Sequence, residues 1–143
     1  FDFAKVVEAS KDNPVFYVQY AHARIASLGR KAAEAGVDLG KRADLGLLDG
    51  EELALVQLAA QFQRTVEGAA VSHEPHRIAF YLYDLAAAFH ALWNRGNDDS
   101  SRRFLIENNP QLSRARLELA LGIGQIIRSG LALMGVEAAE EMR

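Results

Sequence analysis

Apolar residues recur at helical spacing along the chain, and alternating apolar and polar positions never continue for more than a few residues. At about 100° per residue, one side of a first helix gathers Val18, Ala21, Ile25, Leu28 and Ala32. A later helix gathers Ile78, Leu82, Leu85, Phe89, Leu92 and Trp93, and a last one Leu112, Leu119, Ile123, Ile126, Ile127 and Met134. The pattern predicts an all-α fold, an antiparallel bundle of four to five helices.

Local signals mark where these helices begin and end. Asn13-Pro14 places an N-cap residue before a proline at the first helical position, and Asp49 and Glu52 have the spacing of a capping box. The expected helices run from Pro14 to Glu34, from Asp49 through Val66 with a break at Gly68, from Glu74-Pro75 to Arg95-Gly96, and from Asn109-Pro110 to Leu133. Residues 36 to 48 and 96 to 108 are expected loops.

The chain has 143 residues, which suits one domain with one core. It opens with Phe-Asp-Phe and no initiator Met, so we expect a fragment of a longer protein. Residues 1 to 12 are expected to form a leading helix that joins whatever precedes, and residues 13 to 143 the domain itself. No apolar stretch approaches the roughly 20 residues that span a bilayer, so no membrane partner is expected.

Composition adds two expectations. Cysteine is absent, which excludes a disulfide framework and a thiolate metal site and favours a reducing, cytoplasmic home. The formal net charge of -3 argues against holding nucleic acid by bulk electrostatics, so any such site is local. Acids gather at Asp44 to Glu52 and near the C-terminus. We therefore expect local basic patches from cations concentrated away from these acids: Arg24, Arg30, Lys31, Arg95, Arg102, Arg103, Arg114 and Arg116.

Two helix faces carry candidate binding residues. Tyr17, Tyr20, Arg24 and Lys31 share the flank of the first helix, where rings beside cations suit unstacked bases and phosphates. Opposite the core side of the later helix lie His76, Phe80, Tyr83, Ala87, His90 and Asn94. A solvated face rarely carries so many rings, so this helix is either buried on two sides or binds something. The first flank has an ordinary alternative too, in which amphipathic tyrosines border the core and Arg24 is solvated.

Residue patterns for catalysis are missing. His73 and His76 lie three apart at a helix start and His90 is distant, so no zinc-binding spacing appears. No nucleophile motif, Gly-rich phosphate loop or carboxylate pair occurs either. We expect no catalytic residue, metal or cofactor in this fragment.

Three segments resemble the C-terminal anticodon-binding domain, of the DALR type, of arginyl-tRNA synthetases. They are DNPVFYVQYAHARI at residues 12 to 25, EPHRIAFYLYDLAAAFHALWN at 74 to 94, and LALMGVEAAEEMR at 131 to 143. The resemblance implies a helical bundle appended to a catalytic domain that attaches arginine to tRNA with ATP and Mg²⁺. The signature motifs of that domain are absent from this chain, so ATP and Mg²⁺ are expected in the missing part.

The resemblance implies contact with the anticodon loop of tRNA(Arg), and with no DNA. Matched residues are Tyr20, His22, Arg24, Tyr83, Phe89, His90, Trp93, Asn94 and Met142. The helical wheel places Phe89 in the core and His22 as a buried hydrogen-bonding partner, which leaves Tyr20, Arg24, Tyr83, His90, Trp93, Asn94 and Met142 as candidate tRNA-binding residues. Arg143 follows the Met and acids precede it, which makes a terminal base contact less secure. Two alternatives remain: a protein-docking bundle, and the related domain of a cysteinyl enzyme.

Overall fold

The computed structural model describes residues 13 to 142, and the expected leading helix at 1 to 12 lies outside them. The elements are α2 (Pro14–Glu34), η1 (Leu45–Leu47), α3 (Gly50–Ala59), α4 (Phe62–Ser72), α5 (His76–Asp98), η2 (Ser100–Arg102) and α6 (Pro110–Leu133). All regular elements in this part of the chain are helical, which confirms the all-α prediction. None of these helices is long and apolar enough to cross a membrane.

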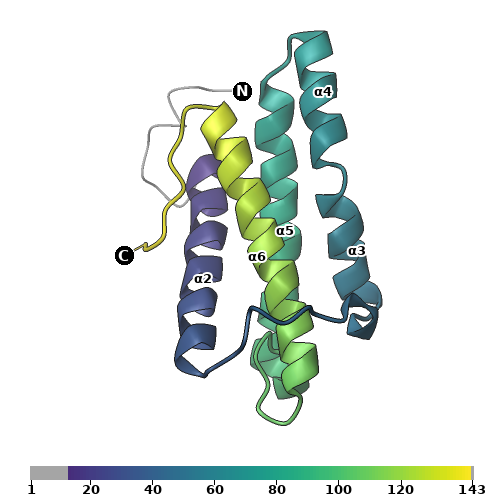
Figure 1. Ribbon diagram of the computed structural model, residues 1–143. Coiled ribbons are helices and arrows are strands. Elements are labelled where there is room, and N and C mark those ends of the chain that lie inside the picture. The colour runs from purple at the N-terminus through teal and green to yellow at the C-terminus, as the bar shows by residue number, and fades with distance from the viewer. Residues whose placement is uncertain (1–12, 143) are drawn as a thin grey trace.

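The bundle alternates in direction along the chain (Figure 1). The α2 helix runs one way, α3 and α4 return end to end, α5 repeats the direction of α2, and α6 returns again. Both α5 and α6 pack against α2, and the α3–α4 arm packs along α5 on the side away from α2. As a result, α2 and α5 lie side by side and parallel, which brings their two candidate faces together.

The predicted caps are present. The side chain of Asn13 accepts a hydrogen bond from the Val15 backbone N–H at 2.9 Å, and Asp49 and Glu52 form a reciprocal capping box. Gly36 follows the end of α2 with φ +76°, a left-handed conformation that suits glycine. These short-range interactions fix where α2 and α3 begin and where α2 ends.

The second helix breaks earlier than predicted. Its interruption falls at Ala60 and Gln61, between α3 and α4, and Gly68 lies inside α4. A side chain from another helix contacts the chain at this break. The Tyr81 hydroxyl donates to the carbonyl oxygens of Leu58 at 2.8 Å and Ala59 at 3.1 Å. These contacts satisfy carbonyls at the end of α3, so the chain can turn there without leaving them unpaired.

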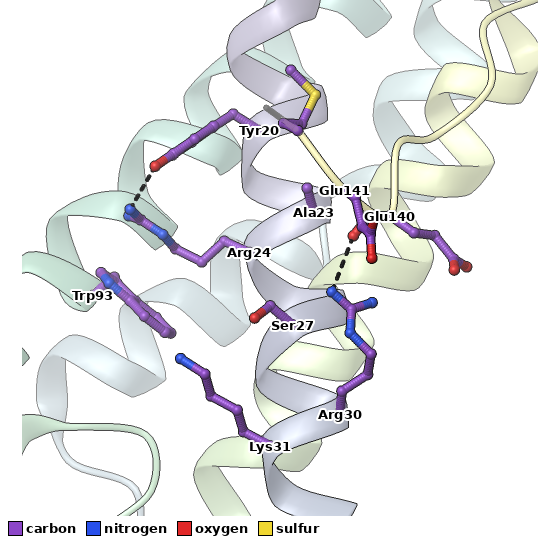
Figure 2. A pocket seen from close by; sticks show the side chains of 10 residues that line it. Tyr20, Ala23, Arg24, Ser27, Arg30, Lys31, Trp93, Glu140 and Glu141 are labelled. Atoms are coloured by element: carbon purple, nitrogen blue, oxygen red, sulfur yellow. Dashed lines mark hydrogen bonds between the residues drawn. The ribbon is translucent and has the colours of Figure 1, made fainter.

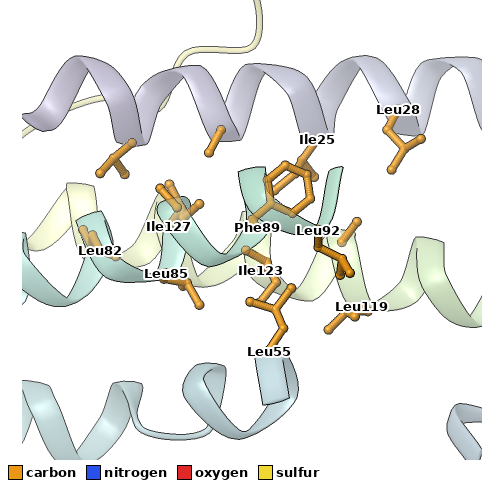
Figure 3. Packing of buried hydrophobic residues seen from close by; sticks show 14 of the residues in the cluster. Ile25, Leu28, Leu55, Leu82, Leu85, Phe89, Leu92, Leu119, Ile123 and Ile127 are labelled. Carbon is orange, nitrogen blue, oxygen red and sulfur yellow. The ribbon is translucent and has the colours of Figure 1, made fainter. Parts of the chain in front are cut away.

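The predicted core stripes are confirmed. Residues of α2, α5 and α6 from those stripes are buried, apart from Trp93, Leu112, Ile126 and Met134, which are half-buried. Figure 3 shows Ile25 and Leu28 of α2 pointing into the core, with Ile25 beside Phe89, while Leu55 of α3 reaches the same core from the opposite side. The core therefore holds α2 and α5 in fixed register.

Ion pairs join the acidic segment to several of the cations. Arg116 donates from Nε to Glu52 at 2.6 Å with both side chains almost fully buried, Arg102 pairs with Asp49, and Arg95 pairs with Glu51 at 3.0 Å. The view of Arg95, Arg102 and Arg116 as cations concentrated away from the acids is therefore wrong. It failed because α3, α5 and α6 meet in space although these residues lie far apart in sequence.

Candidate nucleic-acid interface

Aromatic rings from α2 and α5 form a continuous cluster between the two parallel helices. The Tyr17 ring lies 5.0 Å from the Tyr83 ring and 4.8 Å from the His90 ring, centroid to centroid. The Tyr20 ring lies 5.5 Å from His90 on the same side. Tyr83 is 43% exposed and Tyr20 39%, so the cluster has an open edge on each helix.

Arg24 lies at the centre of this cluster. Its Nη2 donates to the Tyr20 hydroxyl at 3.0 Å, and its Nη1 lies 3.2 Å from Nδ1 of His90. Its guanidinium carbon is 4.9 Å from the Tyr20 ring centroid and 5.0 Å from that of Trp93. Figure 2 shows Arg24 reaching from α2 toward Trp93, with its hydrogen bond to Tyr20. The cation is therefore flanked by rings and held in place by hydrogen bonds.

His90 is only 6% exposed, so at this residue the helix is buried on a second side, which is one of the two alternatives that the sequence left open. The neighbouring helix α2 covers it with Tyr17, Tyr20 and Arg24. The pKa of His90 is lowered to about 4, mainly by burial and in addition by the Arg24 charge, while a backbone hydrogen bond with Tyr17 partly opposes the shift. Because Arg24 donates to Nδ1, the neutral ring carries its proton on Nε2. His90 thus helps to fix the orientation of Arg24 through this hydrogen bond.

A pocket of about 520 Å³ opens beside this cluster. Its wall comes from three segments: α2, the last turns of α5, and the C-terminal tail. The lining residues are Tyr20, Ala23, Arg24, Ser27, Arg30, Lys31, Trp93, Glu140, Glu141 and Met142 (Figure 2). We call it the Tyr20 pocket. It offers two aromatic rings, two planar guanidinium groups, one further cation and two carboxylates.

The tail reaches the pocket because side chains of α2 bind its backbone. Gln19 donates to the Glu137 carbonyl at 3.0 Å, His22 contacts the Ala139 carbonyl at 2.5 Å through Nδ1, and Arg30 donates to the Glu140 carbonyl at 3.4 Å. His22 is buried, as predicted, and its Nε2 lies 3.4 Å from Nη2 of Arg128. These contacts carry the chain to Met142 at the pocket wall.

The structure brings together four of the candidate residues and leaves others apart. Tyr20, Arg24, Trp93 and Met142 line one pocket although they come from three segments. Tyr83 joins the same cluster through Tyr17 but does not line the pocket. Asn94 is exposed next to Trp93 and is also outside the lining set. Phe89 is fully buried, in agreement with its prediction as a core residue.

Sequence reasoning missed several lining residues. Ser27 and Arg30 of α2, and Glu140 and Glu141 of the tail, were not singled out as site residues. Helical spacing could have found Ser27, because positions 20, 24, 27 and 31 repeat at the interval of one helix face. The tail residues carry no such periodic signal. Among residues 13 to 142, no three His, Asp or Glu side chains gather in a way that could hold a metal ion.

Comparisons with known proteins agree with this fold. A family model described as the DALR anticodon binding domain matches residues 18 to 142. This chain therefore belongs to the DALR anticodon binding domain family.

Its relatives are arginine–tRNA ligases. The enzyme of Novosphingobium aromaticivorans is 62% identical over 142 residues, which cover 99% of this chain and 24% of that protein. The Ruegeria pomeroyi enzyme is 56% identical and covers all of this chain and 26% of its own length. The arginyl-tRNA synthetase structure from Thermus thermophilus superimposes with a TM-score of 0.73 at 31% identity, over 99% of this chain and 23% of that one. The chain thus spans about a quarter of these relatives' length.

Proposed function

We propose that this chain is the anticodon-binding part of an arginine–tRNA ligase and that the Tyr20 pocket holds an unstacked base of the tRNA(Arg) anticodon loop. The observation that carries the proposal is the convergence of Tyr20, Arg24, Trp93 and Met142 on one pocket. The rest of the parent enzyme, with ATP and Mg²⁺, would attach arginine to the tRNA. We place this reaction in the cytoplasm, where a cysteine-free chain needs no oxidising environment.

The pocket has the chemistry that single-stranded RNA requires. Bases that leave the stack of an RNA loop pack on aromatic rings and on guanidinium planes, and both are present in Tyr20, Trp93 and Arg24. Lys31 has no ion-pair partner among the described residues, so its charge is available to a phosphate. The carboxylates of Glu140 and Glu141 can accept hydrogen bonds from exocyclic amino groups of a base.

The Tyr83 end of the cluster extends this surface. Tyr83 is partly exposed and contacts Tyr17, which in turn contacts His90 beneath the pocket. A second base or the ribose of a neighbouring nucleotide can pack on the open face of this ring. The proposed interface therefore runs from Tyr83 across Tyr20 to Met142, with Asn94 at its border.

The test is calorimetric binding of an arginine tRNA and of the same tRNA with an exchanged anticodon. Tyr20→Ala and Tyr83→Ala should each weaken binding of the arginine tRNA about 5-fold to 150-fold, because each removes one base-stacking ring. Leu53→Ala is the control, since Leu53 is similarly exposed but lies on α3, away from the pocket. Circular dichroism should show unchanged helix content in all three variants.

Two outcomes would contradict the proposal. If Tyr20→Ala and Tyr83→Ala bind both RNAs as the parent chain does while staying folded, the site assignment is wrong. If the affinity for the arginine tRNA does not fall with rising salt, the chain makes no phosphate contact, and the alternative that the α5 face docks another protein is favoured.

A further inference from the structure

A second, smaller hollow adjoins the Tyr20 pocket and shares two of its wall residues, Lys31 and Trp93. It has a volume of about 210 Å³. The remaining lining residues come from α2, the end of α5 and the loop that follows η2: Leu28, Gly96, Asn97, Arg103, Phe104 and Leu105. We call it the Phe104 hollow. Nothing in the proposed function above uses it.

The walls of the Phe104 hollow are apolar and aromatic. Phe104 stacks on Trp93 with ring centroids 5.7 Å apart and an interplanar angle of 26°. Leu28 and Phe104 are buried, so the base of the hollow is held in place by core packing. The volume is below the roughly 300 Å³ at which pockets for drug-sized ligands begin, so the hollow has room for one planar ring system and little more.

The rim of the hollow is polar and positive. Lys31 and Arg103 are exposed cations, and no carboxylate is among the lining residues. Arg103 is anchored through Nε to the Gly96 carbonyl at 3.0 Å, and its two terminal nitrogens have no hydrogen-bond partner within residues 13 to 142. The exposed Asn97 side chain adds one amide with donors and an acceptor. An apolar slot with this rim suits a flat, polar-edged ring attached to a phosphate.

We propose that the Phe104 hollow is a second nucleobase subsite. It takes the base next in the RNA to the one held in the Tyr20 pocket, Asn97 hydrogen-bonds the edge of that base, and Lys31 contacts the phosphate between the two nucleotides. This proposal rests on the proposed function, because it needs a single strand already bound at the Tyr20 pocket. The supporting observation is that the two sites adjoin. Trp93 and Lys31 line both of them, so one RNA strand can pass over these residues and place a base in each site.

The experiment couples protein variants to RNA variants. The probes are a hairpin with an arginine anticodon loop and three versions in which one anticodon nucleotide is abasic. The proteins are the parent chain, Tyr20→Ala, Leu105→Trp, Asn97→Ala and Lys31→Met. Leu105→Trp would fill the hollow, Asn97→Ala removes the edge contact, and Lys31→Met removes the charge proposed to meet the phosphate. Leu133→Trp is the matched control, because it makes the same substitution at an exposed leucine of α6 away from both sites.

For each probe, the ratio of dissociation constants of variant and parent is measured. Tyr20→Ala should weaken binding about 5-fold or more for the intact hairpin and for two of the abasic hairpins. The third hairpin lacks the base that packs on Tyr20, so its binding should not change. Leu105→Trp and Asn97→Ala should also weaken binding of every hairpin but one. The exception should be the hairpin that is abasic at the position next to the one identified by Tyr20→Ala. Leu133→Trp should bind all probes as the parent chain does. Lys31→Met should weaken binding to every probe and flatten the salt slope by about 0.7.

The outcomes separate the two proposals. If Tyr20→Ala depends on one abasic position but Leu105→Trp and Asn97→Ala weaken all hairpins equally, or none, the second subsite is wrong and the anticodon assignment stands. If Tyr20→Ala shows no dependence on any position, the proposed function fails and the subsite with it. Circular dichroism identifies a variant that has unfolded, and Asn97→Ala, at an exposed position, then decides the question.

Discussion

Nη1 of Arg24 lies 3.2 Å from Nδ1 of His90, so a permanent cation is held against the acceptor nitrogen of a buried imidazole. The two residues come from α2 and α5, and they meet because these helices run parallel through the core. A protonated His90 would face the Arg24 charge with both ring nitrogens as donors. The site therefore depends on His90 remaining neutral.

The first prediction concerns pH and stability. The pKa of His90 is lowered from 6.5 to about 4 in the folded chain, so the unfolded chain takes up the proton first as the pH falls. The stability associated with neutral His90 is present above about pH 6.5 and is lost as the pH falls toward 4. A shift of this size corresponds to roughly 3 kcal/mol.

His90→Asn is the comparison, because the amide oxygen can accept from Arg24 but does not titrate. Urea unfolding of both proteins should show the parent chain losing about 3 kcal/mol more than the variant between about pH 7 and pH 4. Differences common to both proteins, such as those from carboxylates, cancel. Parallel stability curves over this range would mean that His90 is not the titrating group.

The second prediction separates the charge of Arg24 from its shape. Arg24→Lys keeps the charge but cannot hold Tyr20 and His90 with one planar group or offer that plane to a base. Its tRNA affinity should fall about 5-fold or more with an unchanged salt slope. Arg24→Gln should in addition flatten the slope by about 0.7 if the charge meets a phosphate. If Arg24→Lys and the parent chain bound the tRNA with equal affinity, only the charge of Arg24, and not its planar shape, would contribute to binding.

The sequence predicted those features that depend on neighbouring residues. Asn13, Asp49 and Glu52 act on backbone groups within three positions of themselves, so their caps could be read from spacing alone. Helical periodicity likewise separated the buried side of α2 from the flank that carries Tyr20 and Arg24. The break at Ala60 has no glycine or proline beside it in the sequence, and the Tyr81 hydroxyl that binds carbonyls there lies more than 20 residues away.

The candidate site was predicted in its residue types but not in its assembly. Helical spacing placed His90 opposite the core stripe of α5 and left open whether that face is buried, and the position of α2 is what buries it. The tail gave no periodic signal, yet hydrogen bonds from Gln19 and His22 to its carbonyls bring Met142 to the pocket. Such contacts between side chains and distant backbone carry no local pattern.

The third prediction concerns the buried ion pair of Glu52 and Arg116. Glu52→Gln removes the charge while keeping a side chain that can complete the capping box, and it leaves Arg116 as an uncompensated buried cation. Arg116 also donates to the carbonyls of Ser101 and Arg103, so it cannot turn toward solvent without breaking these bonds. The expected loss is about 3 to 5 kcal/mol in urea unfolding.

Glu51→Gln is its matched control on the same helix turn. Glu51 pairs with Arg95 at 3.0 Å, but both side chains are largely exposed, so this change should cost less than about 1 kcal/mol. Similar losses in the two variants would mean that burial does not decide the contribution of these pairs.

The last prediction uses two glycines of α6 that differ only in what they face. A Cβ added at Gly124 would lie 2.9 Å from Cγ2 of Ile25, in the contact between α2 and α6, whereas one added at Gly122 would meet nothing within 4 Å. Ile25 is buried and its Cγ2 is bonded directly to Cβ, so it cannot move away without shifting α2. Gly124→Ala should therefore destabilise the chain by about 1 to 3 kcal/mol through overpacking.

Gly122→Ala should have the opposite sign. Alanine is favoured over glycine inside a helix by about 0.8 to 1.0 kcal/mol, and no contact opposes the change at this position. Thermal and urea unfolding of the two variants against the parent chain measure both effects. Because α2 carries Tyr20 and Arg24, Gly124→Ala should also weaken tRNA binding, while Gly122→Ala should leave it unchanged. A stabilised Gly124→Ala would show that α2 and α6 are packed less closely than their side chains indicate.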